Sequence, residues 1–438
     1  MSSEDILNPP RGMRDVTGVE AELQEYLFEL FKETSRKHGF KPIITPTVEY
    51  FKLFEAKSGE EIKKSMYVFQ DKAGRTLALR PEVTASIIRA YLRGMRGLPK
   101  PIRLYYVAQC FRYEEPQKAR YREFWQGGLE VIGDPDVNAD LSAAFTASSF
   151  LEKLGVKHYY VVGNVALHRA LLNGIGLTVD EQDQVLHLID KDRVSDAVKL
   201  VLEKTGREEH AEILLKLLES SMDDALNLLK DAGILRGEEY SSVEASMEAT
   251  REFIEQLKEL GFQAIYEPRL VRGLAYYTGL IFEYKATGGL DVSIGGGGRY
   301  DGLTRVYGGE YEYSTGLALG LDRVALLLAP ENVLPRRISV VIVMLEDVPL
   351  KAGYNLLRKL AEEDLTLIPY RTRSISRALS YASRLNADIA VVIGRRELES
   401  KSLTVKNLHT GEQVAIELDS GDKLLEWIKK TNRSKPST

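Results

Sequence analysis

Four consecutive glycines at residues 295–298 restrict the possible fold more than any other stretch, because glycine loses the most conformational entropy when a chain folds. The run follows a strand-like segment, 280–294, and precedes Arg299, Tyr300 and Asp301. It is not a phosphate-binding P-loop, since no Gly-Lys-Ser/Thr follows, and it is a poor dinucleotide fingerprint, since no helix opens directly out of it. Alone, the run indicates a glycine-rich turn between strands, so the neighbouring segments must decide its purpose.

Those neighbours predict a sheet-based domain that carries a helical insertion. Short strand-like runs alternate with turns between residues 67 and 133. The pattern then becomes almost wholly helical from about 178 to 258, before strands return at 280–294.

The chain opens with an amphipathic helix and a proline-containing strand. Residues 19–38 carry apolar side chains at helical spacing, and residues 40–54 read as a strand that Pro46 interrupts. Because proline lacks a backbone donor, it belongs at a sheet edge or bend. The helix and edge strand, residues 19–50, are a candidate homodimer surface. Packing of the helix on its own sheet is the alternative, and the sequence favours neither.

A second domain is expected after the segment PENVLP, which gives domains at 1–330 and 331–438. The continuous apolar run ISVVIVML is typical of a strand covered on both faces, and the following βαβαβ order indicates a small parallel sheet. Residues 331–438 carry 18 Lys/Arg against 14 Asp/Glu, whereas the rest carries 41 against 50. A mildly basic domain behind an acidic body is compatible with a polyanionic partner.

Composition excludes several other classes. Cys110 is the only cysteine, so no internal disulfide can form, which fits a reducing, cytoplasmic compartment. The six histidines have no metal-ligand spacing, so no protein-held metal is expected. The polar N-terminus lacks a signal core. The apolar run TGLALGLDRVALLL contains Asp322 and Arg323 and is too short to span a bilayer, so no membrane contact is expected.

Three arginines stand in strong local contexts. Arg112 lies in a strand–loop–strand pattern, Arg272 lies in LVRGLAYYTG, and Arg323 lies in STGLALGLDRVALLL, where a glycine-rich strand turns into a helix. In that helix's opening turn the fixed charge adds to the positive end of the helix dipole. One such arginine is usually a surface residue, but three in glycine- or aromatic-rich settings indicate an anion site.

This arrangement resembles class II aminoacyl-tRNA synthetases, and specifically the histidyl-tRNA synthetase family. The opening helix and strand, the FR…RYREFWQ hairpin and the GLALGLDRV strand–helix correspond to the three class-wide motifs. LVRGLAYYTG and GGGGRYDGL are peculiar to the histidine enzymes, and the resemblance covers nearly the whole chain. It implies an α+β catalytic domain, with an antiparallel sheet flanked by helices and a helical insertion, plus a C-terminal α/β anticodon-binding domain.

The resemblance also implies a reaction. L-Histidine attacks the α-phosphate of ATP, with Mg²⁺, to give histidyl-adenylate and diphosphate, and tRNA(His) then accepts the histidine as AMP leaves. Arginine suits this step because it stays charged and binds phosphate through two nitrogens. By resemblance Arg112 and Arg272 are catalytic. The ATP-binding set is Arg112, Arg120, Phe124 and Arg323, and the glycines Gly296, Gly297 and Gly298 form a floor strand close to the ligand.

Histidine recognition needs a carboxylate for the ammonium group and partners for both ring nitrogens. The resemblance gives the binding set as Glu82, Thr84, Arg112, Gln126, Glu130, Arg272, Tyr276 and Tyr277. Gln126 and Glu130 share a strand face because their spacing is even. Glu82 could instead cap a helix, and Glu130 could be a surface carboxylate. For tRNA the expected contacts are Arg371, Arg373 and Arg377.

Two positions depart from the family pattern, and two other functions compete. Ala275 stands where many relatives carry aspartate, and Asp322 stands where the class usually has glutamate. A non-catalytic regulatory subunit of the histidine-biosynthesis phosphoribosyltransferase shares this catalytic fold, but such subunits lack the C-terminal domain and need not keep the arginines. A pure RNA-binding module is disfavoured by the acidic body and by the complete ATP set.

Overall fold

The computed structural model describes residues 6–56, 65–115, 120–271, 276–287 and 293–432. The chain forms two compact units, Met1–Leu334 and Pro335–Thr438, so the division lies four residues beyond the expected one. Each unit has its own hydrophobic core.

An eight-stranded sheet organises the first unit. Its order is β1-β5-β6-β11-β10-β9-β7-β8. Pairs from β5 to β7 are antiparallel, whereas the edge strands β1 and β8 run parallel to their neighbours, so the predicted antiparallel sheet is confirmed with parallel edges. The strands are β1 Lys41–Pro42, β5 Ile102–Phe111, β6 Glu123–Ile132, β7 His158–Asn164, β8 Ala264–Tyr266, β9 Leu280–Ala286, β10 Ser293–Arg299 and β11 Ser314–Gly320.

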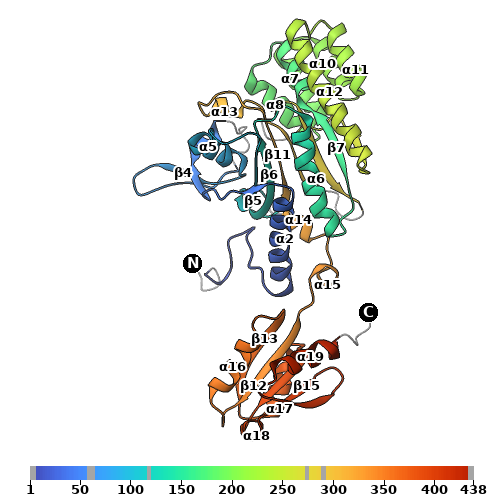
Figure 1. Cartoon of the computed structure of the whole chain (residues 1–438). Coiled ribbons are helices and arrows are strands. Elements are labelled where there is room, and N and C mark those ends of the chain that lie inside the picture. The colour runs from blue at the N-terminus through green and yellow to red at the C-terminus, as the bar shows by residue number, and fades with distance from the viewer. Residues whose placement is uncertain (1–5, 57–64, 116–119, 272–275, 288–292, 433–438) are drawn as a thin grey trace. The chain divides into compact units, whose positions relative to one another are not determined.

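Helices cover both faces of this sheet. On one face α2 (Gly18–Lys37) and α6 (Val137–Lys153) pack side by side, as Figure 1 shows, together with α14 (Leu321–Ala325). The apolar side chains Leu23, Leu27, Phe28 and Phe31 of α2 are buried in that core. The opening helix therefore packs on its own sheet, which was the alternative to an exposed dimer helix.

The other face carries α5 (Thr84–Gly94) and most of the helical insertion, whose last helix also packs against α6 through Phe253, Ile254 and Leu257. After β7 the chain forms α7 (Val165–Gly174) and five further helices before returning to the sheet at β8. Figure 1 shows these helices gathered at one end of the unit. They are α8 Val179–Asp190, α9 Val194–Thr205, α10 Glu208–Leu217, α11 Met222–Asp231 and α12 Gly237–Glu259.

A separate three-stranded sheet, of order β2-β4-β3, lies between the opening helix and α5 in the sequence. Its strands are β2 Val48–Tyr50, β3 Val68–Gln70 and β4 Thr76–Leu79. The strand expected at 40–54 is interrupted around Pro46 as predicted, but its two parts, β1 and β2, belong to different sheets, and its last residues form α3 (Phe51–Glu55) instead of a strand. Phe54 is buried in a small core of its own, and this tertiary contact overrides the strand-like pattern.

The second unit is the predicted small α/β domain. Its sheet has the order β13-β12-β14-β15-β16, with the first three strands parallel and the last two antiparallel. Helices α16 and α19 cover one face and α17 covers the other. The bounds are β12 Ile338–Leu345, α16 Leu350–Leu360, β13 Leu365–Thr372, α17 Ile375–Arg384, β14 Ile389–Ile393, α18 Arg395–Glu399, β15 Ser402–Asn407, β16 Gln413–Glu417 and α19 Gly421–Asn432.

Two short helices complete the described elements, α13 (Leu303–Val306) and α15 (Pro330–Val333), the latter within the expected linker. Within the described ranges, none of the helices has the length and apolar character that a membrane crossing requires.

Candidate active site

A buried carboxylate, Glu130 of β6, lies at the centre of the candidate site. Its side chain is 1% exposed, so the alternative of a surface carboxylate is wrong. Thr84 Oγ1 donates a hydrogen bond to Oε1 of Glu130 over 2.7 Å, and the Tyr300 hydroxyl donates to Oε2. Both carboxylate oxygens therefore have partners from segments far apart in the sequence.

Burial changes the chemistry of this carboxyl. It raises the pKa of Glu130 to about 8, against the hydrogen bonds from Tyr300 and Thr84, which favour the charged form. The neighbouring carboxylate of Glu82 raises the pKa further. A group that titrates near neutrality can both accept and release a proton there.

The floor beneath Glu130 consists of glycines. Glu130 pairs with Gly316 of β11, and Gly316 pairs with Gly298 of β10. Directly opposed residues of neighbouring strands share a face, so all three positions lie on one face of the sheet. A Cβ on Gly316 would lie 1.8 Å from Oε2 of Glu130, so only glycine leaves room for the carboxylate.

A second row of small residues runs beside the first one, and the Tyr106 ring covers its first member, where an added Cβ would lie 2.1 Å from Cζ of Tyr106. It contains Gly128, Ala318 and Gly296, which pair with one another across β6, β11 and β10. Gly297, which was expected beside them, belongs to the opposite face, where an added Cβ would lie 2.0 Å from the carbonyl oxygen of Gly316. Most of the run's glycines are thus needed for close strand packing, and Gly296 and Gly298 also leave the site face flat.

Glu82 is buried near Glu130, and Arg112 is half-buried near Glu82. The amide of Ala85 donates to Glu82 over 3.1 Å, so Glu82 does cap the first turn of α5, as considered above. Burial raises the pKa of Glu82, while the amides of Ala85 and Thr84 and the charge of Arg112 act in the opposite direction. Arg112 donates through Nε to the carbonyl of Pro81 over 3.0 Å, and its guanidinium lies 5.3 Å from the centre of the Phe124 ring.

Gln126 and three tyrosines complete the inner site. Gln126 accepts a weak hydrogen bond from Cys110 Sγ over 3.2 Å and lies on the same strand face as Glu130. The Tyr276 ring centre lies 5.0 Å from that of Tyr277 and 5.9 Å from that of Tyr300. Burial, followed by the Glu82 carboxylate, raises the pKa of Tyr276 well above its usual value, so the phenol stays protonated.

Arg323 projects from the strand–helix turn that ends the sheet's central strand. Its Nη1 donates to the carbonyl of Ser293 over 2.6 Å. The preceding residue, Asp322, accepts from the amide of Trp125 over 2.6 Å and so fixes α14 against β6. The aspartate side chain, although shorter than the glutamate usual in this class, therefore reaches the backbone of β6.

Not every expected residue can be placed with this group. Arg272 and Ala275 lie outside the described residues. Arg120 is exposed in the hairpin between β5 and β6. Within the described parts of the chain, no group of three or more His, Cys, Asp or Glu side chains could hold a metal ion.

Sequence reasoning gave no function to Arg299, Tyr300 and Asp301 of the GGGGRYDGL motif, and the structure shows the contacts that each of them makes. Arg299 forms a buried ion pair with Asp140 of α6, Nη2 to Oδ2 over 2.7 Å. Tyr300 bonds Glu130, as described above, and Asp301 accepts from the amide of Ser314 over 2.7 Å. The alternation of side chains along a strand could have indicated that Arg299 and Tyr300 serve opposite faces.

Two family models match the chain over its two units. The model described as histidyl-tRNA synthetase matches residues 12–324, and the one described as anticodon binding domain matches residues 339–431. The chain belongs to the histidyl-tRNA synthetase family. Among curated members, a histidine–tRNA ligase from Saccharolobus solfataricus is 36% identical over 424 residues, which cover 96% of this chain and 98% of that protein.

Solved structures of this family have the same fold. The apo histidyl-tRNA synthetase of S. aureus matches with a TM-score of 0.70 at 28% identity, over 97% of this chain and all of that one. A Bacillus halodurans structure titled ATP phosphoribosyltransferase regulatory subunit/histidyl-tRNA synthetase matches with a TM-score of 0.71 over 89% of this chain and 98% of that one. Its identity is 21%, so it shows the shared fold alone.

Proposed function

We propose that this chain is a histidine–tRNA ligase that forms histidyl-adenylate from histidine and ATP and transfers the histidine to tRNA(His). The observation that carries this proposal is the buried Glu130, held by Thr84 and Tyr300 above a bare glycine floor. A flat imidazole can lie against such a floor and present its N–H to the carboxylate. The family membership and the curated relative support the same reaction.

Charge stabilisation drives the first step in this proposal. The histidine carboxylate and the α-phosphate are both anionic, and more charge develops on phosphorus in the transition state. Arg112, fixed by Pro81 and the Phe124 ring, would neutralise the α-phosphate from one side, and Arg272 from the other. Arg323 and Phe124 would enclose the adenine, with Arg120 on the outer phosphates.

ATP would enter as its Mg²⁺ complex. Magnesium keeps several waters and usually binds substrate phosphates with one or two carboxylates, so no dedicated protein cage is needed.

Recognition of the amino acid follows from the same geometry. Glu82, with Gln126 beside the floor, would bind the substrate ammonium group, because a carboxylate and an amide oxygen accept its N–H bonds. Glu130 would accept from the imidazole, and Tyr276 and Tyr277 would close the pocket from the side. Tyr300 joins this set, because it fixes the orientation of Glu130.

The second unit would hold the tRNA. Arg371, Arg373 and Arg377 are exposed at the carboxyl end of β13 and the start of α17. Arg373 pairs with Glu346 over 2.6 Å, and Arg371 donates to the carbonyl of the same residue. Ligands of open α/β sheets bind outside the carboxyl ends of the strands, and this supports tRNA binding at the edge of the sheet where the three arginines lie.

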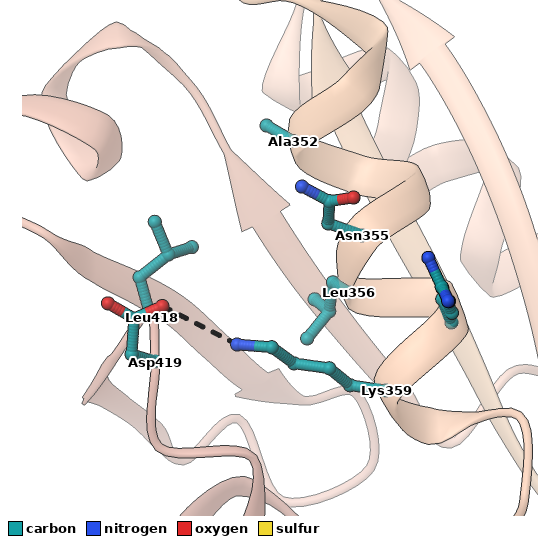
Figure 2. A pocket seen from close by; sticks show the side chains of 7 residues that line it. Ala352, Asn355, Leu356, Lys359, Leu418 and Asp419 are labelled. Carbon is teal, nitrogen blue, oxygen red and sulfur yellow. Dashed lines mark hydrogen bonds and ion pairs between the residues drawn. The ribbon is translucent and has the colours of Figure 1, made fainter.

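A hollow elsewhere on the unit is less suited to RNA. It has about 530 Å³ and lies between the end of α16 and the turn after β16. Figure 2 shows Lys359 reaching toward Asp419, and their charges lie 3.4 Å apart. The hollow has two cations, Arg358 and Lys359, and this pairing neutralises one of them, whereas three arginines lie at the carboxyl edge beside the single carboxylate of Glu346.

One experiment tests the proposed reaction. Histidine alone among the twenty amino acids should support ATP–pyrophosphate exchange, and the purified protein should charge tRNA(His). A regulatory subunit of a phosphoribosyltransferase would instead bind histidine without exchange. Exchange with another amino acid, or with none, would contradict the proposal.

Glu130→Gln should weaken histidine binding about 10- to 100-fold, because a buried polar mismatch costs roughly 1–3 kcal/mol. ATP binding should stay within about two-fold of the parent value.

Since the pKa of Glu130 is about 8 and the ionised form accepts the imidazole N–H, the KM for histidine should fall as the pH rises toward 8. The variant should lose this dependence. Calorimetry and pH profiles measure both effects, with the exposed Glu310→Gln as the control; equal losses for ATP and histidine would indicate a structural role.

We further propose a homodimer, formed through the three-stranded sheet rather than through the whole of residues 19–50. Val48, Tyr50, Phe69, Leu77 and Leu79 lie on one face of the three-stranded sheet, since their positions oppose one another in register. Tyr50 is 53% exposed and Phe69 is 42% exposed. An exposed apolar sheet face of this kind needs a partner, and a second copy paired by a two-fold axis supplies the same face.

Phe69→Arg should therefore dissociate the dimer. A charge in the centre of an apolar contact has no partner and must be desolvated, which costs several kcal/mol. Light scattering should show the parent at twice the 49.2 kDa chain mass and the variant at that mass. Leu260→Arg, at an exposed position after α12, should stay dimeric; a dimeric Phe69→Arg protein would reject this surface.

The reducing compartment expected from the sequence points to the cytoplasm. Cys110 is buried and free, so the fold uses no disulfide. A protein that charges tRNA would also find its substrates there.

A further inference from the structure

A turn ahead of the first long helix, residues 10–14, packs against the hairpin between β5 and β6. Met13 donates to the carbonyl of Pro10 over 2.9 Å, which closes the turn, and the Arg122 amide donates to the carbonyl of Gly12 over 2.8 Å. Gly12 has a φ of +83°, and a Cβ there would lie 2.7 Å from Cγ of Arg122. The close approach therefore requires glycine.

The Arg122 side chain, which precedes β6, also contacts the residues that follow β5, so it joins the two arms of the hairpin. Its Nε donates to the carbonyl of Glu114 over 3.0 Å, and its guanidinium lies 3.8 Å from the centre of the Tyr113 ring. The side chain is 7% exposed. The turn is thus fastened to the segment that carries Arg112 and Phe124.

Arg14 extends the contact to the opposite wall of the site. Its guanidinium lies 4.4 Å from the centre of the Tyr121 ring and pairs with Glu20 of α2. It also lies 3.6 Å from the carboxylate of Asp322, the residue before Arg323. One side chain therefore touches the hairpin, the opening helix and the start of α14.

We propose that Arg14 is a positioning residue for ATP, which fixes the spacing between the hairpin wall at Phe124 and the helix wall at Arg323. It acts through Tyr121 and Asp322 rather than on the nucleotide. If both walls already have their bound arrangement before ATP arrives, less free energy is spent on ordering them when ATP binds. This inference rests on the proposed function, which assigns those walls to ATP.

Arg14→Ala should raise the ATP Kd in calorimetry, and the ATP KM in pyrophosphate exchange, by about 10-fold, since small misplacements of a site are costly. The histidine Kd and the melting temperature should stay close to the parent values. Arg14→Lys keeps the charge near Glu20 and Asp322 but loses the planar stacking, so it should recover only part of the affinity. The matched control is Lys32→Ala, which removes an exposed ion pair with Glu29 on α2, the helix that also carries Glu20.

The coupling can be measured directly. If Arg14 acts through the hairpin, Arg14→Ala and Tyr121→Leu should weaken ATP binding non-additively. An unchanged ATP Kd, additive effects, or equal weakening of ATP and histidine together with a lower melting temperature would overturn the inference. A parent protein that binds ATP but shows no histidine-dependent exchange would refute the proposed function, while the ATP Kd of Arg14→Ala would still decide the inference.

Discussion

Arg112→Ala is expected to slow histidine-dependent pyrophosphate exchange by about 100- to 1,000-fold, the usual loss when one donor to a developing anion is removed. Arg112 is fixed from two sides, by its hydrogen bond to Pro81 and by the Phe124 ring beneath its guanidinium. A group already held in place loses little freedom when the phosphate arrives, so most of its attraction is available in the transition state. Burial raises the pKa of Glu82, and the charge of Arg112 acts against this and so favours the ionised form that would bind the substrate ammonium group.

The rate loss should fall mainly on kcat, because the contact strengthens as charge develops. Arg112→Lys should remain strongly impaired, since an ammonium group cannot bind phosphate through two nitrogens. Arg93→Ala, at an exposed position on the neighbouring α5, is the control and should exchange normally. Exchange by Arg112→Ala within a few-fold of the parent, with circular dichroism unchanged, would show that another cation carries the step.

Removal of residues 335–438 should separate adenylation from tRNA charging. The described site residues of the first unit all lie before Leu334, and the second unit has its own core around β12, so the cut crosses no core. Pyrophosphate exchange should stay within a few-fold of the parent rate. Charging of tRNA(His) should fall by about 100-fold, because each lost base contact costs about 1–3 kcal/mol.

The loss should arise from RNA binding, and this can be separated from damage to the first unit. Filter binding should show weaker tRNA affinity with a smaller salt dependence, since counterion release follows the number of phosphate contacts. Arg371→Ala combined with Arg377→Ala in the intact chain should reproduce part of the loss. Full charging by the truncated protein would refute the anticodon assignment, and loss of exchange in a folded protein would show that the units are not independent.

The fold was predictable where local pattern and family motif agreed. The even spacing of Gln126 and Glu130 correctly gave a shared strand face, and the apolar run at 338–345 correctly gave a strand covered on both sides. The short helix at 51–55 was missed, because the burial of Phe54 in a local core is a tertiary contact that no periodicity reports.

Sequence reasoning singled out Thr84 and Glu130, which the structure brings into contact, but not the residues that support them, and the expected ligand contacts stay predictions. Gly316 lies 186 residues after Glu130, and only the strand register shows that its missing side chain makes room for the carboxylate. The ion pair of Arg299 with Asp140 likewise joins a strand and a helix 159 positions apart. Single-sequence reasoning finds the groups that chemistry requires, whereas packing decides which neighbours must be small or oppositely charged.

The single cysteine has a practical consequence for following this molecule at work. Cys110 is fully buried, and burial raises the pKa of its thiol to about 12, so it offers almost no thiolate to a maleimide dye at neutral pH. New cysteines at exposed positions of the two units, such as Leu260 and Tyr354, can therefore be labelled in the natural background. A donor and an acceptor dye on one chain would report the distance between the units through each cycle of tRNA charging.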